Sequence, residues 1–240
     1  MKWKKDEPFT SEHVVRGHGW WTGPVGRLVA HGLWNTEIIG KENLPRTGPA
    51  IVASNHTGVA DGPLVHAAMP REVYTMTKKG MMQSRGGWFL RASGQFPVDR
   101  KNGRGGLQIA LDLLKEGRVV VMFPEGHRGS GTGEGIKAGV AWLAQRSGAP
   151  VVPVAVLGTR PRGRSVGYIP RFRAKLYVVL GEPILRPEEL PRGREGTARA
   201  MEIIEAGLEA HVARAVELTG VELPGDEGIR DEQDRFKTED

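Results

Sequence analysis

The chain has 240 residues, 39% hydrophobic and 26% charged, a composition typical of a globular protein and unlike that of a disordered one. Its net charge is +6, the sum of −5 between Val221 and Asp240 (eight acidic and three basic residues) and +11 on residues 1–220. The strongly basic residues 1–220 favour anionic partners such as phosphorylated substrates, lipid headgroups or nucleic acid. The absence of cysteine excludes disulfide bonds, a thiolate nucleophile and cysteine-based zinc sites.

Residues 1–45 are expected to form an N-terminal amphipathic segment in front of the main domain. No run in the chain approaches the ~20 apolar residues that a membrane-spanning helix needs, and no signal-peptide pattern opens it. Such a helix would either lie in a membrane interface, with aromatic side chains at headgroup depth, or pack on the body of the protein, and the pattern fits both. Its apolar residues recur at helical spacing: Trp21, Val25, Leu28, Val29 and Leu33.

A short apolar run at residues 50–54 ends in the pair Asn55-His56, and the carboxylate of Asp61 follows five residues after the histidine. The run predicts a buried strand with His56 at its carboxyl end, where open α/β sheets place their ligands. Five residues leave His56 and Asp61 on nearly opposite faces of a regular helix, so they meet only across a bent loop, which Gly58 permits. A histidine oriented by a carboxylate is a base able to deprotonate a hydroxyl near neutral pH.

Both members of this pair also have an ordinary interpretation. Asp61, followed by Gly62 and Pro63, fits the start of a helix, and His56 fits an ordinary loop histidine. The spacing alone is therefore a hypothesis of catalysis, which needs support from the rest of the chain.

Further along, short apolar runs alternate with segments of helical periodicity. This alternation predicts an α/β fold, an α/β/α layered arrangement with a mostly parallel central sheet. The main domain is expected at residues 46–218, and the acidic stretch 219–240 is expected to be disordered. The expected strands are 72–76, 96–100 at an edge, 118–123, 151–157 and 172–180, and the expected helices are 64–69, 107–114, 136–143 and 195–218.

A glycine-rich loop that carries Glu125 and Arg128 follows the strand predicted at 118–123. Neighbouring parallel strands end at the same edge of a sheet, so this loop and the His56 loop are expected to face one crevice. Arg128 is suited to bidentate capture of a phosphate or carboxylate, and Arg100 is a second candidate for that task. Each arginine taken alone also fits a solvated surface ion pair.

Four sequence blocks occur in order along the chain: Asn55-His56 through Asp61, Gly94 through Arg100, Phe123-Pro124-Glu125-Gly126 with Arg128, and Val152 through Ala155. Together they resemble the lysophosphatidate (1-acylglycerol-3-phosphate) acyltransferase family within the glycerolphosphate acyltransferase superfamily. The resemblance covers about residues 40–185, and the ordered occurrence of four blocks is more specific than any one of them.

The resemblance implies that His56 deprotonates the acceptor hydroxyl while Asp61 orients its imidazole, and that the hydroxyl oxygen attacks an acyl thioester without a covalent enzyme intermediate. It implies 1-acylglycerol-3-phosphate as acceptor, with another lysolipid or glycolipid as the alternative, and acyl-coenzyme A or acyl-carrier protein as co-substrate. We also expect no metal, no cofactor and no nucleic acid, and a peripheral position on the phospholipid surface at the cytoplasmic face of a membrane. The substrate-binding residues would be Asn55, Lys78, Arg100, Glu125, Gly126 and Arg128.

The chain departs from the family pattern in two places. His127 and Gly129 stand where the family usually has a threonine and a serine around the arginine of the third block. The N-terminal segment is shorter and more polar than in members with membrane-spanning helices. Glu125 and Arg128 of the family pattern are retained.

Two rival functions have less support. Gly163-Arg164-Ser165-Val166-Gly167 fits the G-x-S-x-G motif of serine hydrolases, but its flanks predict neither the strand nor the helix that this motif needs. The basic residues between Arg160 and Lys175 indicate a protein that binds anionic surfaces. An aromatic content of 6% argues against recognition of nucleic-acid bases. The glycines at 129–135 lack the Gly-Lys-Ser/Thr step of a phosphate-binding NTPase, and the histidines lack metal-hydrolase spacing.

Overall fold

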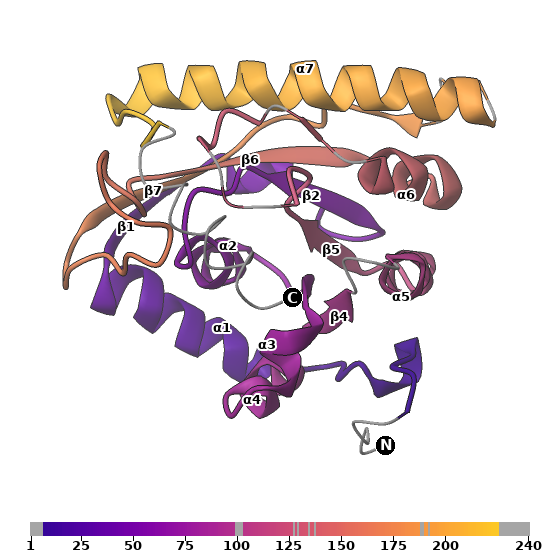
Figure 1. Ribbon diagram of the computed structural model, residues 1–240, viewed down its shortest axis with the longest axis horizontal. Coiled ribbons are helices and arrows are strands. Elements are labelled where there is room, and N and C mark those ends of the chain that lie inside the picture. The colour runs from indigo at the N-terminus through magenta and orange to yellow at the C-terminus, as the bar shows by residue number, and fades with distance from the viewer. Residues whose placement is uncertain are drawn as a thin grey trace, which may run out of the picture.

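The computed structural model describes residues 7–98, 103–126, 128, 130–133, 135–136, 138–187, 190–191 and 193–225. Seven strands form one sheet in the order β1-β7-β6-β2-β5-β3-β4 (Figure 1). The five strands from β6 to β4 are parallel, whereas β7 runs antiparallel to β6 and pairs in parallel with β1. The strands are β1 (Asn35–Ile39), β2 (Ala50–Ser54), β3 (Val73–Lys78), β4 (Phe96–Val98), β5 (Val119–Met122), β6 (Val151–Leu157) and β7 (Lys175–Leu180).

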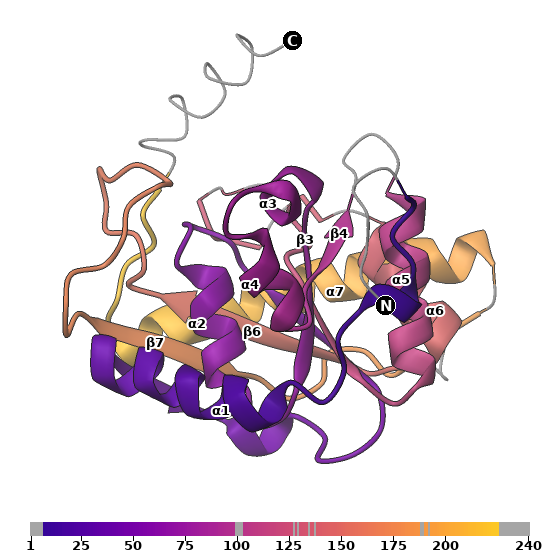
Figure 2. The same ribbon diagram turned by 90° about the horizontal axis from the view of Figure 1, so that it is seen from below.

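Helices cover both faces of this sheet, as Figures 1 and 2 show. One face carries α5 (Arg104–Lys115), α6 (Gly139–Ser147) and the long α7 (Arg194–Thr219), and the other carries α1 (Gly19–Arg27) and α2 (Asp61–Ala68). The short helices α3 (Lys79–Gln83) and α4 (Gly87–Ala92) connect β3 to β4. The predicted α/β/α layers with a mostly parallel sheet are confirmed. Three further short helical segments are η1 (Ser11–His13), η2 (Leu28–Leu33) and η3 (Lys41–Asn43).

The central strand β2 lies between β5 and β6 and is buried along its whole length. Ile51 and Ala53 pack in the core under α5 and α6, while Val52 packs in the core under α2. A strand covered on both faces needs apolar side chains at every position, which explains the continuous apolar run in the sequence. This burial holds the end of β2, and therefore the start of the His56 loop, in a fixed place.

The sheet extends into the stretch assigned above to the N-terminal segment. Residues Asn35–Ile39 form the edge strand β1, which pairs with β7 from Asn35 opposite Lys175 to Ile39 opposite Val179. Only part of this strand is buried, and its acidic Glu37 forms an ion pair with Lys175 at 2.7 Å. A short half-exposed edge strand has a weak sequence signal, because its position depends on the partner strand rather than on local periodicity.

A helix is present where one is expected near residues 21–33: α1, continued by the π-helical η2. Gly26 packs closely against Ala67 of α2, while Trp20 and Leu28 are 81% and 67% exposed. Within the described part of the chain, no helix has the length and apolar character to cross a membrane. Val221 packs against the core under α7, but residues 226–240, most of the acidic stretch, lie outside the described residues.

Candidate active site

The expected loops converge at the edge of the sheet where β2, β3 and β5 end. A cavity of about 380 Å³ opens there, and His56, Lys78, Gly126 and Arg128 line it. β2 leads into His56, β3 ends at Lys78, and the loop after β5 carries Gly126 and Arg128. These strands are parallel to one another, so their carboxyl ends meet at one edge.

The rest of the cavity wall is largely apolar. Its side chains come from β3, α3, α4, α5 and α6, which are far apart in the sequence. An apolar wall with a few polar groups at one end suits a ligand that has a hydrocarbon part and a polar part. The apolar lining residues include Met76, Met81, Leu90, Leu107, Met122, Phe123 and Val140.

His56 and Asp61 meet across the bent loop that follows β2. His56 Nδ1 lies 3.0 Å from Asp61 Oδ2, and the side chain of His56 is 15% exposed while that of Asp61 is completely buried. Asp61 is also the first residue of α2, where the helix dipole favours a negative charge. The sequence allows two interpretations of Asp61, as the start of a helix or as the partner of His56, and in the structure Asp61 is both.

The carboxylate of Asp61 is held by several further hydrogen bonds. Its Oδ2 accepts from the backbone N–H of Thr57 at 2.5 Å and of Gly58 at 2.8 Å. Its Oδ1 accepts from the hydroxyl of Thr159 at 2.5 Å. A buried carboxylate is costly unless its oxygens are hydrogen-bonded, and these donors offset that cost while they fix the orientation of the group.

The loop after β5 holds the other side of His56. The rings of His56 and Phe123 stack with centroids 4.2 Å apart and planes 27° from parallel. The buried Glu125 accepts a hydrogen bond from the His56 backbone N–H at 3.3 Å. Because Nδ1 faces Asp61 and the ring lines the cavity, Nε2 is the nitrogen that a ligand meets.

Asn55, which the resemblance assigns to substrate binding, is enclosed by protein. Its side chain is fully buried, and Nδ2 donates to the carbonyls of Gly131 at 3.1 Å and Val156 at 3.2 Å. Its Oδ1 accepts from the backbone N–H of Val156 at 2.8 Å. Both amide protons are thus used inside the fold, where they tie the end of β2 to β6 and to the glycine-rich loop.

The remaining site residues fall into two groups. Lys78 and Arg128 bring two positive charges to the cavity, and Gly126 adopts a positive φ of 70°, which a glycine tolerates without strain. Arg100 lies outside the described residues, and so do His127 and Gly129, the two positions that depart from the family pattern.

The site predicted from the sequence does not include Thr57, Thr159 or the apolar wall that α3 and α4 contribute. The one available signal for Thr159 is its place two residues after β6, since β6 neighbours β2 in the sheet. Nothing in the local pattern of Met81 or Leu90 indicates that they face the same cavity as His56, because this follows from the packing of two short helices.

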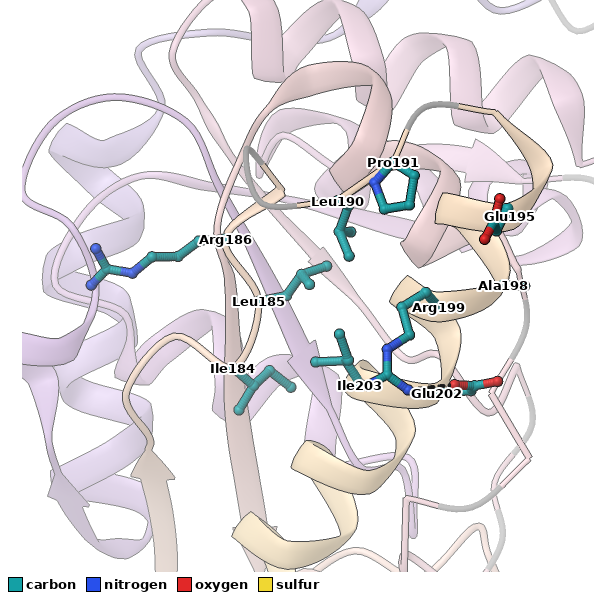
Figure 3. A pocket seen from close by; sticks show the side chains of 10 residues that line it. All are labelled: Ile184, Leu185, Arg186, Leu190, Pro191, Glu195, Ala198, Arg199, Glu202 and Ile203. Carbon is teal, nitrogen blue, oxygen red and sulfur yellow. Dashed lines mark hydrogen bonds and ion pairs between the residues drawn. The ribbon is translucent and has the colours of Figure 1, made fainter.

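A larger cavity of about 620 Å³ lies beside the first turns of α7 (Figure 3). Arg199 and Glu202, which line it, form an ion pair at 2.8 Å. Leu185, in its wall, is bridged to Val151 at the amino end of β6, so this cavity is at the opposite edge of the sheet from His56. The smaller cavity is therefore the candidate active site.

Ser165 lies in an exposed loop between β6 and β7, with no strand leading directly into it and no helix directly after it. It therefore lacks the strand–turn–helix setting of a hydrolase serine. In the described ranges, no group of three His, Cys, Asp or Glu side chains is placed to hold a metal ion.

Comparisons with known proteins show which family and which fold the chain resembles. A family model described as "Acyltransferase" matches residues 35–157. The chain is 35% identical over 153 residues to the 1-acyl-sn-glycerol-3-phosphate acyltransferase of Bacillus subtilis (strain 168), a match that covers 62% of this chain and 73% of that protein. It is 33% identical over 133 residues to the 1-acyl-sn-glycerol-3-phosphate acyltransferase of Chlamydomonas reinhardtii, which covers 53% of this chain and 40% of that longer protein.

A solved structure has the same fold. The crystal structure of the 1-acyl-sn-glycerophosphate (LPA) acyltransferase PlsC from Thermotoga maritima superposes with a TM-score of 0.60 and 24% sequence identity, covering 79% of this chain and 78% of that one. At this identity the likeness concerns the fold alone.

Proposed function

Because this chain belongs to the acyltransferase family, we propose that it moves a fatty acyl group from an acyl thioester to the free hydroxyl of 1-acylglycerol-3-phosphate, in phospholipid synthesis. The observation that carries the proposal is the placement of His56: its Nδ1 contacts the buried Asp61, and its ring lines a cavity with apolar walls and two cationic side chains.

In the proposed reaction His56 is the general base. A carboxylate accepts hydrogen bonds only, so Nδ1 carries the ring proton and Nε2 has the free electron pair. Nε2 takes the proton of the acceptor hydroxyl while the oxygen attacks the thioester carbonyl carbon. The tetrahedral intermediate then collapses, the C–S bond breaks, and the imidazolium returns the proton to the leaving thiolate.

The charges at the cavity support an anionic acceptor. Lys78 and Arg128 line the cavity together with His56, and we propose that they bind the phosphate of the glycerol phosphate, with Arg100 in the same task on the basis of the resemblance. Glu125 and Gly126 shape the loop that presents Arg128, and Glu125 also holds the backbone of His56. The hydrocarbon part of a substrate fits the apolar wall.

An exposed apolar surface beside the cavity supports a peripheral position on a membrane. We call the aromatic face the set Trp20, Met81, Trp88 and Phe89, which are 81%, 43%, 64% and 43% exposed. Trp21 contacts Phe89 edge to face at 5.6 Å between centroids, so α1 and α4 pack against each other here. An apolar surface rich in tryptophan is suited to the interface of a bilayer, and we place this face on the phospholipid surface at the cytoplasmic side.

The cavity and the aromatic face share the α3–α4 segment. Met81 lines the cavity and is also 43% exposed, and Leu90 of α4 lines the cavity next to the exposed Phe89. A lipid acceptor that leaves a bilayer bound to this face therefore has a short path to His56. The exposed Lys79 and Arg85 add positive charge that attracts anionic headgroups.

The test is an assay of the purified chain with acyl-coenzyme A and acyl-carrier protein as donors, each paired with 1-acylglycerol-3-phosphate, another lysophospholipid and a glycolipid. We expect ester formation, with the highest kcat/KM for 1-acylglycerol-3-phosphate. His56→Ala should lower kcat by about 10²–10⁴-fold, whereas the control His13→Ala, at η1, should retain activity. A preference for another lysolipid would change the acceptor, release of free fatty acid would indicate a hydrolase, and full activity of His56→Ala would overturn the mechanism.

A further inference from the structure

Asp61 is reached from two sides, and one of them comes from a distant part of the chain. In the hydrogen bonds described above, the partners of Oδ2 are His56 and the backbone N–H groups of Thr57 and Gly58. All three belong to the loop between β2 and α2. Its Oδ1 has its short contact, 2.5 Å, with the hydroxyl of Thr159, 98 residues further along the chain. The carboxylate is therefore held between its own loop and the segment after β6.

The two threonine hydroxyls at this carboxylate form a directional chain. Thr57 Oγ1 lies 3.0 Å from Thr159 Oγ1 and 3.4 Å from each oxygen of Asp61. A hydroxyl can donate one hydrogen bond, and a carboxylate can donate none. Thr159 therefore donates its hydrogen bond to Asp61 and accepts one from Thr57. Hydrogen bonds linked in this way polarise one another in a buried environment.

Neither hydroxyl is easily replaced by solvent. Thr159 is 0% exposed and Thr57 is 2% exposed. Arg160, the next residue, is also buried and donates to the carbonyl of Gly225 at 3.1 Å, which anchors the segment that carries Thr159. Loss of the Thr159 hydroxyl would remove the donor of the short hydrogen bond to Oδ1, and no solvent could replace it. We expect the carboxylate of Asp61 to rotate in response.

From this geometry we propose that Thr159, supported by Thr57, is a positioning residue for acyl transfer, which fixes the carboxylate of Asp61 so that its Oδ2 holds the imidazole of His56 in the productive orientation. The inference rests on the proposed roles of His56 and Asp61. Thr159 does not line the cavity, so it acts through Asp61 and not on the substrate. Its removal should therefore lower kcat and leave the KM values for donor and acceptor nearly unchanged.

The test compares Thr159→Val, which removes the hydroxyl at nearly constant shape, with Thr159→Ser, which keeps it. We expect kcat of Thr159→Val to fall about ten- to a hundredfold, with both KM values within about threefold, and Thr159→Ser to regain most of the loss. Thr36→Val is the matched control, because Thr36 Oγ1 on β1 is buried without a hydrogen-bond partner among the described residues, and it should leave kcat unchanged.

A second measurement separates positioning from a general loss of structure. In an Asp61→Asn background, Thr159→Val should have almost no further effect on kcat, because the group on which it acts has already lost its charge. If Thr159→Val does not fold, Thr57→Val provides the same comparison, since its backbone N–H to Asp61 is retained, and it should lower kcat by a smaller factor.

Wild-type kcat in Thr159→Val, equal losses in Thr159→Val and Thr159→Ser, or fully additive losses with Asp61→Asn would each overturn the inference. These outcomes differ from failure of the proposed function. If His56→Ala is inactive while Thr159→Val has wild-type kcat, the acyltransferase mechanism stands and only the role of Thr159 is lost. If His56→Ala is fully active, the mechanism itself fails.

Discussion

The side chain of Asn55 continues the pairing of β2 with β6 beyond the last strand residue. Its amide accepts from the backbone N–H of Val156 at 2.8 Å and donates to the carbonyl of Val156 at 3.2 Å, as a neighbouring strand would. The second amide proton goes to the carbonyl of Gly131. We therefore propose that Asn55 serves the active site indirectly, because it fixes the point at which the chain leaves β2 and turns into His56.

Replacement of Asn55 should reduce stability more than substrate binding. Asn55→Ala leaves buried backbone groups of Val156 and Gly131 without partners, so we expect the free energy of unfolding to fall by about 3 kcal/mol in urea titrations. Asn35→Ala, at an exposed position of β1, should change it by less than about 0.5 kcal/mol. An unchanged stability with a strongly raised KM would return Asn55 to a role in substrate binding.

Gly131 is needed for its conformation and for its lack of a side chain. Its φ is +80°, and a Cβ there would overlap the side chain of Thr57, which contacts Asp61. Gly135 has a similar φ of +70° but open space around the Cβ position. Gly135→Ala should therefore cost about 1–2 kcal/mol of stability from backbone strain, with activity retained.

Gly131→Ala should cost more stability than this and also lower kcat, because the overlap displaces Thr57 from the carboxylate of Asp61. Thermal unfolding and steady-state kinetics of both variants make the comparison. Equal effects of the two substitutions would show that the packing against Thr57 is unimportant.

The half-buried His66 of α2, whose Nδ1 is enclosed by protein, predicts a loss of stability on acidification. Burial, assisted by the nearby His18, lowers the pKa of His66 to about 4, against about 6.5 in the unfolded chain. Between these values the unfolded state binds more protons, so the stabilising contribution is complete above about pH 6.5 and is lost as the pH falls toward 4, on the order of 3 kcal/mol in total. Burial also lowers the pKa of His18, which adds an effect of the same sign.

Urea unfolding between about pH 4.5 and 7.5 measures this dependence. In His66→Gln the free energy of unfolding should vary less steeply with pH than in the wild type, by up to about 1.4 kcal/mol per pH unit. Thr36→Val, which changes no titratable group, serves as the control and should keep the wild-type dependence. Identical curves for His66→Gln and the wild type would contradict the assignment.

The aromatic face should control binding to membranes. In co-sedimentation with vesicles that contain anionic phospholipid, the double variant Trp88→Ala/Phe89→Ala should bind at least about tenfold more weakly, since each side chain contributes roughly 1.5–3 kcal/mol when buried. Leu218 is 63% exposed on α7, which covers the opposite face of the sheet from α1, so Leu218→Ala should bind like the wild type. Equal losses in both variants, or no loss in either, would exclude this face as the membrane contact.

The sequence by itself determined the features that depend on residues close together along the chain. Strands buried on both faces, such as β2 and β5, require apolar side chains at every position, and that run is visible without a structure. Parallel strands end at one edge, so the His56 loop and the Arg128 loop were predictable neighbours. His56 and Asp61 lie five residues apart across a glycine-containing bend, which limits how they can meet.

Only the tertiary structure decided which distant groups surround that pair. The hydroxyl of Thr159 reaches Asp61, the amide of Asn55 turns to Val156 instead of the cavity, and α3 and α4 close the apolar wall. The edge strand β1 likewise exists through its pairing with β7. The direction of a side chain and the partner of a buried polar group depend on how segments a hundred residues apart pack together, and no local periodicity records that packing.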